Sequence, residues 1–496
     1  MQTVTADALR DEMWRRIQAL LERGTPQQLA EYQTEDGIIR FVREILGVKS
    51  ITSYQEDILR AFVRTRRVAV RGPHGLGKST TAAWAVLWAM SVFPTDVKVV
   101  TTASVWRQLE HYLWPEIHKW ARGARWDLLG MEVREGKELL QLSLKIKDRE
   151  AFAAASDNPS YIEGAHASVV FFIFDEAKAI PDPMWDAAEG AFSQAGVGGR
   201  LAFALAISTP AEPSGRFYDI HSRKRGFEDW WTRHVTLEEA VRAGQISAEW
   251  AEQKRIQWGE ESPAFQNRVL GEFSTHAENT VIPLSWIEAA TERWLEQQGV
   301  GVGKESIGVD VARFGEDRSA IVRMVGRTMT SLEYVGQRDA MEIAGRVAQM
   351  ANKKTPIGVD SIGVGAGVVD RLREQGYNVI PINTATSTDM TDVSGELFFL
   401  NLRSAMWWMM RDGLDPTNPY PIAIIPDDEL IGELVAPRWR LTSRGAIQIE
   451  SKDEIRKRLK RSTDGADALG HALLAQMAPV LGQSLIYEEN LRVTIE

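Results

Sequence analysis

Apolar residues follow two different spacings in the first half of the chain, and each spacing predicts one kind of element. Helical spacing runs through 8–24 and 38–47, so residues 1–50 are predicted to form a helical segment. Buried strands are predicted where the chain is almost continuously apolar, at 66–70, 97–103, 138–146, 168–174 and 200–209. Helical patterns at 78–92 and 105–121 lie between them. Strands that alternate with helices favour a mostly parallel sheet with helices on both faces.

The second half begins a new series of strands. A helix over 284–298 runs into the glycine-rich "GVGVGKES", which is typical of a linker. An antiparallel meander is predicted from the strands 306–312, 319–326 and 328–336. Further elements are predicted at 339–352 (helix), 356–361 (strand), 378–382 (strand), 394–412 (helix) and 464–478 (helix). Three strands, then helix, strand, helix, strand and helices is the order of a ribonuclease H-like domain.

The stretch 68–88, "VAVRGPHGLGKSTTAAWAVLW", joins a predicted strand to a predicted helix through a glycine-rich loop. It fits the pattern G-x-x-x-x-G-K-[ST], whose backbone N–H groups wrap around phosphates. In such a loop Lys78 reaches the outer phosphates and Ser79 ligates Mg²⁺. The predicted nucleotide-binding residues are Gly72, Pro73, His74, Gly75, Leu76, Gly77, Lys78, Ser79 and Thr80. The sequence therefore predicts hydrolysis of a nucleoside triphosphate with Mg²⁺.

An acidic pair completes this predicted site. The apolar strand in "VVFFIFDEA" ends in Asp175 and Glu176. Asp175 would hold the Mg²⁺ shell, and Glu176 would orient and activate the attacking water. A helix N-cap followed by a carboxylate in the first turn is the alternative explanation for such a pair. The spacing from the loop favours the metal and water roles.

Three weaker signals accompany the pair. Tyr54 and Gln55 suit an adenine site, or are a core tyrosine beside a helix-surface glutamine. Ser208 and Thr209 in "ISTP" could sense the γ-phosphate, or could simply end a strand before proline. Transition-state charge also requires an arginine, and Arg71 beside the loop is the candidate within this chain. The candidates for action on a neighbouring subunit are Arg122, Arg125, Arg134 and Arg149.

Four aspartates in the second half predict a metal centre. Asp310 lies in the strand "IGVDVA" and Asp360 ends the strand "IGVDSIG"; Asp464 and Asp467 lie three apart on one helix face. A buried carboxylate normally meets a metal or a cation. Together these carboxylates would bind two Mg²⁺ or Mn²⁺ ions for phosphodiester hydrolysis. Taken singly, each could instead start a turn or cap a helix, and Asp317 is predicted to be a turn residue.

A run of basic residues precedes the last two aspartates. It consists of Arg456, Lys457, Arg458, Lys460 and Arg461. Two explanations carry equal weight: a solvated helix face, and contact with DNA phosphates beside the predicted metal centre.

Composition narrows the class of protein. The chain has 496 residues, no cysteine and a net charge of −10, so neither disulfides nor thiolate metal sites are possible. The charge disfavours nonspecific coating of nucleic acid but allows local basic patches. No apolar run is long enough to span a membrane, and the N-terminus lacks a signal peptide's apolar core. We therefore expect a cytoplasmic protein that does not associate with membranes.

With both sites in place, the chain resembles the large terminase subunit of tailed bacteriophages. The matching stretches are "SYQEDILR", "GPHGLGKST", "VVFFIFDEA", "ISTP", "RVLGEFSTHAENTVIP", "IGVDVARFGEDRSAIV", "GVDSIGVGAGVVDRL" and "DGADALGHAL". The resemblance implies an ASCE-type packaging ATPase joined to a ribonuclease H-like DNA endonuclease. It also implies double-stranded DNA, the procapsid portal protein and a small terminase subunit as partners. The location implied is the host cytoplasm, on the portal but outside the mature virion.

The resemblance also bears on individual residues and on assembly. It matches "ISTP" to the motif that couples hydrolysis to movement, and it favours Asp467 over Asp464 as the direct ligand. A homo-oligomeric ring is implied during packaging, with a monomer in isolation as the alternative. The predicted division is 1–50 (helical segment), 51–275 (P-loop ATPase), 276–304 (linker with helix) and 305–496 (nuclease). The competing functions are a cellular helicase–nuclease of DNA repair and an assembly protein whose sites have decayed.

Overall fold

The computed structural model describes residues 25–154, 166–274, 279–311, 318–336, 339–443, 445–459 and 462–481. The chain divides into two compact units, described separately below. The first comprises Met1–Trp250 with Asn267–Phe273, and the second comprises Ala251–Gln266 with Ser274–Glu496. The helix predicted over 8–24 and the predicted turn residue Asp317 lie outside the described residues.

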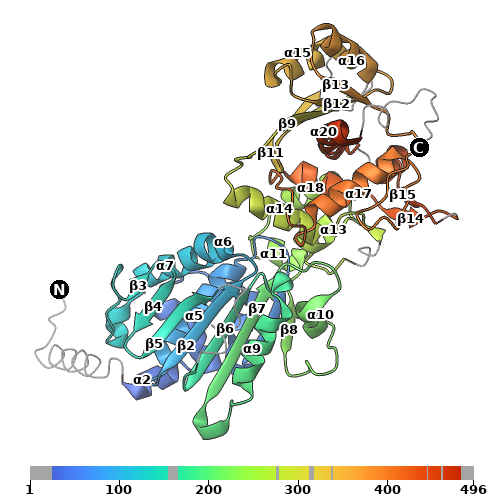
Figure 1. The fold of residues 1–496 in the computed structure, drawn as a ribbon. Coiled ribbons are helices and arrows are strands. Elements are labelled where there is room, and N and C mark those ends of the chain that lie inside the picture. Colours follow the sequence, from blue (N-terminus) through green and yellow to red (C-terminus); the bar gives the residue numbers. More distant parts are fainter. Residues whose placement is uncertain are drawn as a thin grey trace, which may run out of the picture. The chain divides into compact units, whose positions relative to one another are not determined.

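A mostly parallel sheet forms the centre of the first unit, as predicted (Figure 1). Its strand order is β3-β4-β5-β2-β6-β7-β1-β8. The strands are β1 (Arg67–Arg71), β2 (Val97–Ala103), β3 (Leu139–Leu140), β4 (Ser143–Ile146), β5 (Arg149–Ala154), β6 (Val169–Asp175), β7 (Leu201–Ser208) and β8 (Trp231–His234). Among the described residues of this sheet, the pairings β3–β4 and β4–β5 are antiparallel and the other strand pairings are parallel. The single strand predicted over 138–146 is wrong, because the chain turns back after Leu140 and pairs Leu139 with Leu144.

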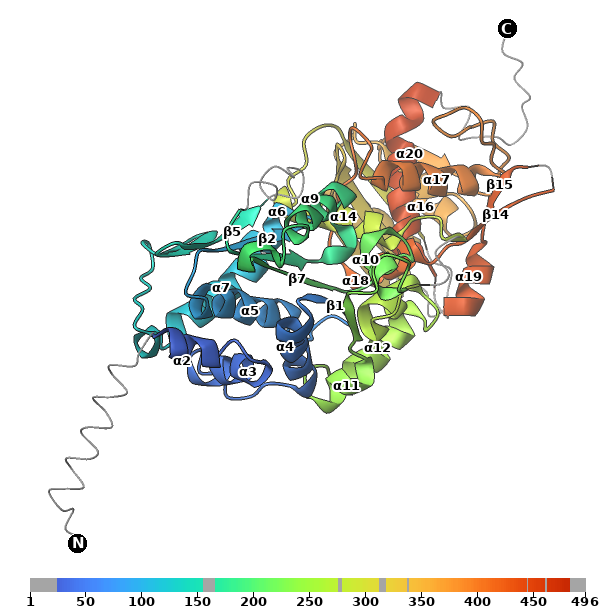
Figure 2. The ribbon, with the colours of Figure 1, turned by 90° about the horizontal axis from the view of Figure 1, so that it is seen from below.

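Helices cover both faces of this sheet (Figure 2). Helices α3, α4, α5 and α7 pack on one face around Phe62 and Trp88, and α9 and α10 pack on the other around Phe174 and Trp185. Helix α5 is buried nearly all round, which explains why its sequence shows almost no polar face. The helices of this unit are α2 (Pro26–Glu31), α3 (Glu35–Glu44), α4 (Ser53–Thr65), α5 (Lys78–Val92), α6 (Trp106–Gln108), η1 (Leu109–Leu113), α7 (Trp114–Gly123), η2 (Trp126–Leu129), η3 (Ala177–Ala179), α9 (Asp182–Phe192), η4 (Val197–Gly199), α10 (Gly215–His221) and α11 (Leu237–Arg242).

The second unit contains a five-stranded sheet in the order β11-β10-β9-β12-β13. Strands β9, β10 and β11 form the antiparallel meander, and β12 and β13 extend it in parallel to β9. This arrangement confirms the predicted order of a ribonuclease H-like domain. The strands are β9 (Glu305–Asp310), β10 (Arg318–Val325), β11 (Thr328–Gly336), β12 (Ile357–Asp360) and β13 (Val379–Ile382).

The two faces of this sheet carry different partners (Figure 1). Ile307 and Val309 face α15 and α16, whereas Gly308 lies against α20. Because side chains alternate along a strand, Asp310 lies on the same face as Gly308, toward α20. Asp360 follows Gly358 in the same way, and Gly358 also lies against α20. The sheet therefore directs both strand-end aspartates toward the helix that begins with Asp464.

Among the remaining elements of the second unit, α17 and α18 pack against α20. The helix predicted over 394–412 begins later, at Leu402, because Asn401 caps it by accepting from the N–H of Ser404. Among the described residues, no helix is long and apolar enough to cross a membrane. The elements are α12 (Ala248–Trp258), which begins in the first unit, α13 (Pro263–Phe265), α14 (Leu284–Glu296), α15 (Ala340–Met350), α16 (Gly365–Glu374), α17 (Leu402–Leu414), α18 (Asp428–Val435), β14 (Trp439–Leu441), β15 (Ile447–Ile449), α19 (Lys452–Leu459) and α20 (Asp464–Leu481). The short helix η5 (Gln266–Leu270) lies in the first unit except for Gln266.

The predicted domain boundaries differ from these units in two places. Residues 251–266 group with the second unit, because Trp258 Nε1 donates to the carbonyl of Asp428 at 2.7 Å and Lys254 pairs with the same residue. Helix α14, expected in a linker, also lies in the second unit, where Arg293 donates to the carbonyl of Ile422 at 2.8 Å. These contacts join segments that are more than a hundred residues apart in sequence.

Alanine at Gly308 is expected to destabilise the second unit, because a Cβ there would overlap the carbonyl oxygen of Ala468. Overpacking of this kind typically costs about 1–3 kcal/mol, which calorimetry would detect as a lower melting temperature. Gly345→Ala in α15 is the matched control, because a Cβ there meets nothing within 4 Å. An unchanged melting temperature for Gly308→Ala would contradict the close packing of α20 on β9.

Candidate functional site

The glycine-rich loop lies between β1 and α5, as the sequence predicts. Gly75 and Gly77 adopt left-handed backbone conformations, with φ of 84° and 73°, which glycine reaches without a steric cost. The Nζ of Lys78 donates to the carbonyl of Pro73 at 2.7 Å. Burial lowers the pKa of Lys78 to about 8, although the nearby charges of Glu176 and Asp175 oppose that shift. Of the nine predicted residues, Gly72 to Gly77 form the loop, and Lys78, Ser79 and Thr80 form the start of α5.

The order of strands brings the acidic pair next to this loop. Strand β7 lies between β1 and β6, so Ser208 pairs with Arg71 and Ile207 pairs with Asp175. The hydroxyl of Ser79 donates to Asp175 Oδ2 at 3.3 Å. Burial raises the pKa of Asp175 to about 7, and the charge of Glu176 raises it as well. The predicted metal-shell residues Ser79 and Asp175 are therefore adjacent, with oxygen atoms suited to Mg²⁺.

Glu176 occupies a strained backbone conformation. Its φ of 48° and ψ of 50° lie in the left-handed region, which costs a non-glycine residue about 1–3 kcal/mol. Ser208 Oγ donates to its Oε2 at 3.0 Å, and Thr209 Oγ1 lies 3.5 Å from the same oxygen. The structure thus brings the two "ISTP" hydroxyls directly onto the predicted catalytic carboxylate.

Tyr54 and Gln55, predicted to suit an adenine site, make contacts within the protein instead. Tyr54 is buried, and its hydroxyl donates to the carbonyl of Leu76 in the loop at 3.1 Å. The amide oxygen of Gln55 accepts from both donors of Thr52, and its nitrogen donates to Thr81 at 3.2 Å. These contacts attach helix α4 to the loop through Leu76 and to the first turn of α5 through Thr81. They leave Gln55 without the free amide edge that a bidentate pair with adenine requires.

Arg71 is held by the segment 267–273, which returns to the first unit. Its guanidinium donates to the carbonyl of Gly271 at 2.6 Å, pairs with Glu272 and lies over the ring of Phe273. Arg149, a candidate for action on a neighbouring subunit, is buried and donates to two carbonyls at the end of α5. Two exposed candidates are engaged in ion pairs, Arg122 with Glu135 and Arg134 with Glu132 and Glu138. The third, Arg125, is exposed at the N-cap of η2.

The same returning segment touches the loop itself, which the sequence did not reveal. The N–H of His74 donates to the carbonyl of Arg268 at 2.9 Å. Gly271 has a φ of 69°, and a Cβ there would lie 2.5 Å from the Cα of Gly72. A glycine inside "RVLGEF" is the only local signal of this contact. The segment fixes the start of the loop from the side opposite α5.

In the second unit, three carboxylates gather around one lysine. Lys452 Nζ lies 2.8 Å from Asp310 Oδ2, 3.1 Å from Asp467 Oδ2 and 3.8 Å from Asp464 Oδ1. Asp360 ends the strand beside Asp310, one residue beyond the paired Val359 and Val309. The structure therefore brings together the predicted aspartates, and it adds a lysine that no local pattern marked.

The charges of this cluster shift its pKa values in opposite directions. Burial raises the pKa of Asp464 to about 8, and the charge of Asp310 adds to that shift. Burial also raises the pKa of Asp360. Burial alone would lower the pKa of Lys452, but the charges of Asp310, Asp467 and Asp464 raise it above its usual range. The lysine therefore stays charged among the carboxylates.

Asp467 is the most firmly held of the four aspartates. Its Oδ1 accepts from Arg403 at 2.8 Å and from Trp407 at 3.1 Å, and its Oδ2 accepts from Thr463 at 2.8 Å. Burial would raise its pKa, but Arg403 and Lys452 hold it below the usual range. Asp464 has fewer such partners and a more exposed side chain. Asp464 is therefore freer to turn toward a metal, whereas Asp467 Oδ2 lies closer to Lys452 Nζ. The preference for Asp467 as the direct ligand stays a prediction.

The residues present fit a divalent cation. In the described part of the chain, no three acidic or histidine side chains are arranged closely enough to hold a metal ion as they stand, and the ammonium of Lys452 lies among the carboxylates. The carboxylates nevertheless converge on a positive charge, as oxygen ligands of Mg²⁺ or Mn²⁺ must. Buried His471, one turn after Asp467, is 3.0 Å from the carbonyl of Val309 through Nδ1. Its Nε2 has no hydrogen-bond partner among the described residues, so an imidazole nitrogen remains as a further ligand.

The predicted basic run is only partly exposed. Arg456 and Lys457 are exposed on α19, whereas Arg458 donates to Glu450 at 2.6 Å and to the carbonyl of Ala436 at 2.7 Å. Lys460 and Arg461 lie outside the described residues. Arg458 therefore anchors α19, while Arg456 and Lys457 face solvent.

A known large terminase subunit is similar in sequence to most of this chain. The chain is 23% identical over 469 residues to the "Probable terminase, large subunit" of Enterobacteria phage P7, covering 88% of this chain and 90% of that protein. It is therefore similar to a large terminase subunit over most of its length, which confirms the resemblance seen in its motifs. No protein-family model matches the chain.

Solved structures of large terminases are also similar. The large terminase of a thermophilic bacteriophage is 15% identical, with a TM-score of 0.41, and the match covers 86% of this chain and 100% of that chain. The nuclease domain of the large terminase subunit gp2 of bacterial virus Sf6 is 18% identical, with a TM-score of 0.34, and the match covers 39% and 97%. The protein of the thermophilic bacteriophage has been solved with ADP, and a mutant of the Sf6 domain has been solved with manganese.

Gly271→Ala is expected to disturb the glycine-rich loop, because the new Cβ would press on Gly72 and Pro73. Misplacing a phosphate-binding group by about 1 Å can cost roughly 100-fold in rate, so hydrolysis of ATP should fall steeply. Gly244→Ala is the matched control, since its φ of 68° imposes the same backbone strain but its Cβ meets nothing within 4 Å. Equal rates for the two variants, measured at saturating ATP, would refute the proposed support of the loop.

Proposed function

We propose that this chain is the large subunit of a terminase, the motor that packages viral DNA. ATP hydrolysis in the first unit drives double-stranded DNA through the portal into a procapsid. A metal-dependent endonuclease in the second unit cuts concatemeric DNA. The observation that carries this proposal is the presence of two complete sites in one chain. A phosphate loop stands with its acidic pair in one unit, and strand-end carboxylates gather beside α20 in the other.

The first unit has the parts needed for phosphoryl transfer to water. Lys78 neutralises the outer phosphates, and Ser79 with Asp175 would hold Mg²⁺, which supplies charge between the β- and γ-phosphates. Glu176 accepts a proton from the attacking water, and Ser208 holds its carboxylate in place at 3.0 Å. Because Ser208 ends β7, any movement of Glu176 during turnover reaches the strand through this hydroxyl. We infer that this contact couples hydrolysis to movement.

The second unit has the parts needed to cleave a phosphodiester. Asp310, Asp360 and Asp464 would hold two Mg²⁺ or Mn²⁺ ions, which activate water and steady the leaving oxygen. Asp467 instead holds Lys452 and Arg403 in position. Without a divalent ion, Lys452 offsets the repulsion among the carboxylates. Arg456 and Lys457 on α19 would grip DNA phosphates beside this site.

The finer parts of the proposal follow from the packaging role. The partners are double-stranded DNA, the portal protein and a small terminase subunit, and the working form is a homo-oligomeric ring. The protein would work in the host cytoplasm, docked on the portal during packaging and absent from the mature virion. ATP-driven encapsidation of DNA by purified procapsids tests this directly. DNA protected from nuclease only when both ATP and this protein are present is the expected result. Hydrolysis of ATP without any protected DNA would overturn the packaging role.

Glu176→Gln is expected to bind ATP but hydrolyse it about 100-fold or more slowly, because an amide cannot take a proton from water. Lys78→Ala should lose both nucleotide binding and hydrolysis, since the outer phosphates lose the cation that neutralises them. Nucleotide binding by fluorescence and phosphate release, measured on the same preparations, separate the two effects. Loss of binding in Glu176→Gln with normal turnover in Lys78→Ala would reverse the assigned roles.

Asp310→Asn is expected to abolish Mg²⁺- or Mn²⁺-dependent nicking of plasmid DNA while leaving the ATPase rate within about twofold of wild type, because the metals lose a charged ligand. Asp453→Asn is the matched control, since Asp453 is exposed in the first turn of α19 beside Lys452. Nicking that survives in Asp310→Asn would refute the carboxylate cluster as the nuclease site. Loss of ATPase activity in a folded Asp310→Asn variant would refute the separation of the two activities.

A further inference from the structure

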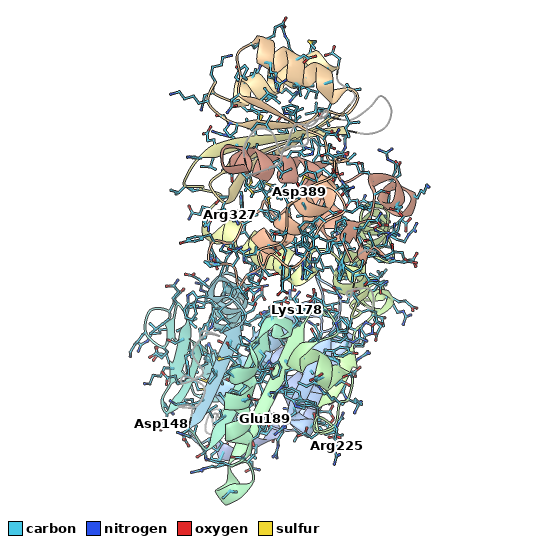
Figure 3. The ribbon with its side chains drawn as sticks, turned by 45° about the vertical axis from the view of Figure 1, so that its right-hand side comes forward. Asp148, Lys178, Glu189, Arg225, Arg327 and Asp389 are labelled. Atoms are coloured by element: carbon cyan, nitrogen blue, oxygen red, sulfur yellow. The ribbon has the colours of Figure 1, made fainter. Side chains whose placement is uncertain are left out.

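Lys178 occupies a position in the ATPase site that no motif assigns. It follows the acidic pair in the short helical turn η3, after the left-handed conformation of Glu176 has reversed the chain. Its side chain is only 10% exposed. Figure 3 labels it at the edge of the sheet where β6 and β7 end. A lysine so deeply buried needs a partner for its charge.

Lys178 contacts Glu176 and the two hydroxyl residues at the end of β7. Its Nζ donates to Thr209 Oγ1 at 3.0 Å and lies 3.9 Å from Glu176 Oε2. Its backbone N–H is 3.4 Å from Ser208 Oγ, which in turn donates to Glu176 Oε2 at 3.0 Å. Both hydroxyls of the strand end therefore contact Lys178 as well as the carboxylate.

The charge of Lys178 also reaches the phosphate loop. It contributes to the lowered pKa of Lys78, while the charges of Glu176 and Asp175 oppose that shift. Two lysines thus lie close to the acidic pair. Arg71 does not supply this charge, because its guanidinium is engaged by Gly271, Glu272 and Phe273.

We propose that Lys178 is a positioning residue that acts through Glu176. Its ammonium and the two strand-end hydroxyls hold the carboxylate in the orientation needed to take a proton from water. The inference rests on the ATPase activity proposed above and assigns a further residue to it. A residue with this role supports hydrolysis and contributes little to the affinity for nucleotide.

Substitution of Lys178 by methionine tests this role, since methionine keeps most of the length and removes the charge. Lys178→Met should lower kcat by roughly 10- to 100-fold, less than the roughly 100-fold or more expected when the general base itself is lost, and leave the Kd for ATPγS within about threefold. Lys178→Arg should recover part of the rate. Lys224→Met, at an exposed lysine paired with Asp219, is the control and should match wild type. A rate equal to wild type in folded Lys178→Met would overturn the proposal.

A double variant tests whether Lys178 acts through Glu176. Adding Lys178→Met to Glu176→Gln should cause no further loss of kcat, because the group being positioned is already removed. A full additional loss would mean that Lys178 acts on the phosphate directly, which would overturn the positioning role. If Lys178→Met does not fold, Thr209→Val removes the partner of the ammonium and should lower kcat with the same unchanged Kd; an unchanged kcat there would refute the proposal. Absence of hydrolysis by the wild-type protein would instead overturn the ATPase itself.

Discussion

A carboxylate buried at the end of a parallel strand must meet a positive charge, and both candidate sites are built around this constraint. In the first unit Asp175 and Glu176 end β6 close to Lys78 and Lys178. In the second unit Asp310 ends β9 against Lys452, and Asp467 lies against Arg403. Removing an ion from water costs several kcal/mol, and each lysine offsets part of that cost for the carboxylates beside it. The same arrangement leaves oxygen atoms ready for a divalent metal.

Close approach of the backbone decides where these carboxylates meet. Gly308 and Gly358 let α20 lie directly on β9 and β12, which brings Asp464 and Asp467 over the strand ends. In the first unit Gly271 lies against Gly72 and so holds the start of the phosphate loop. A side chain at any of these glycines would push the elements apart. The geometry of each site therefore depends on residues that take no part in the chemistry.

The elements and the acids could be predicted because their signals are local. The bounds of α5 and β2 follow from the length and spacing of their apolar runs, and Asp175, Asp310 and Asp360 follow directly from the strands that carry them. The lysines that pair with these acidic residues could not be predicted from local sequence. Lys452 is 142 residues from Asp310. Lys178 stands two residues after Glu176, but its role depends on hydroxyls 30 and 31 residues further on. Arg71 is the opposite case: its position beside the loop can be seen in the sequence, but its partner Glu272 is 201 residues away.

The sequence by itself determined the order of strands and helices, the phosphate loop and the set of acidic residues, because periodicity and short motifs act within a few turns of chain. Only the tertiary structure decided which cation meets each carboxylate, and that Asp467 is held by Arg403 while Asp464 is freer. The tertiary structure also decided that the Gln55 side chain is hydrogen-bonded to Thr81 beside the loop. These outcomes depend on which distant segments pack together, and a side chain's partners are chosen by that packing. No local pattern carries the information, since the same lysine or arginine would read as an ordinary surface residue in isolation.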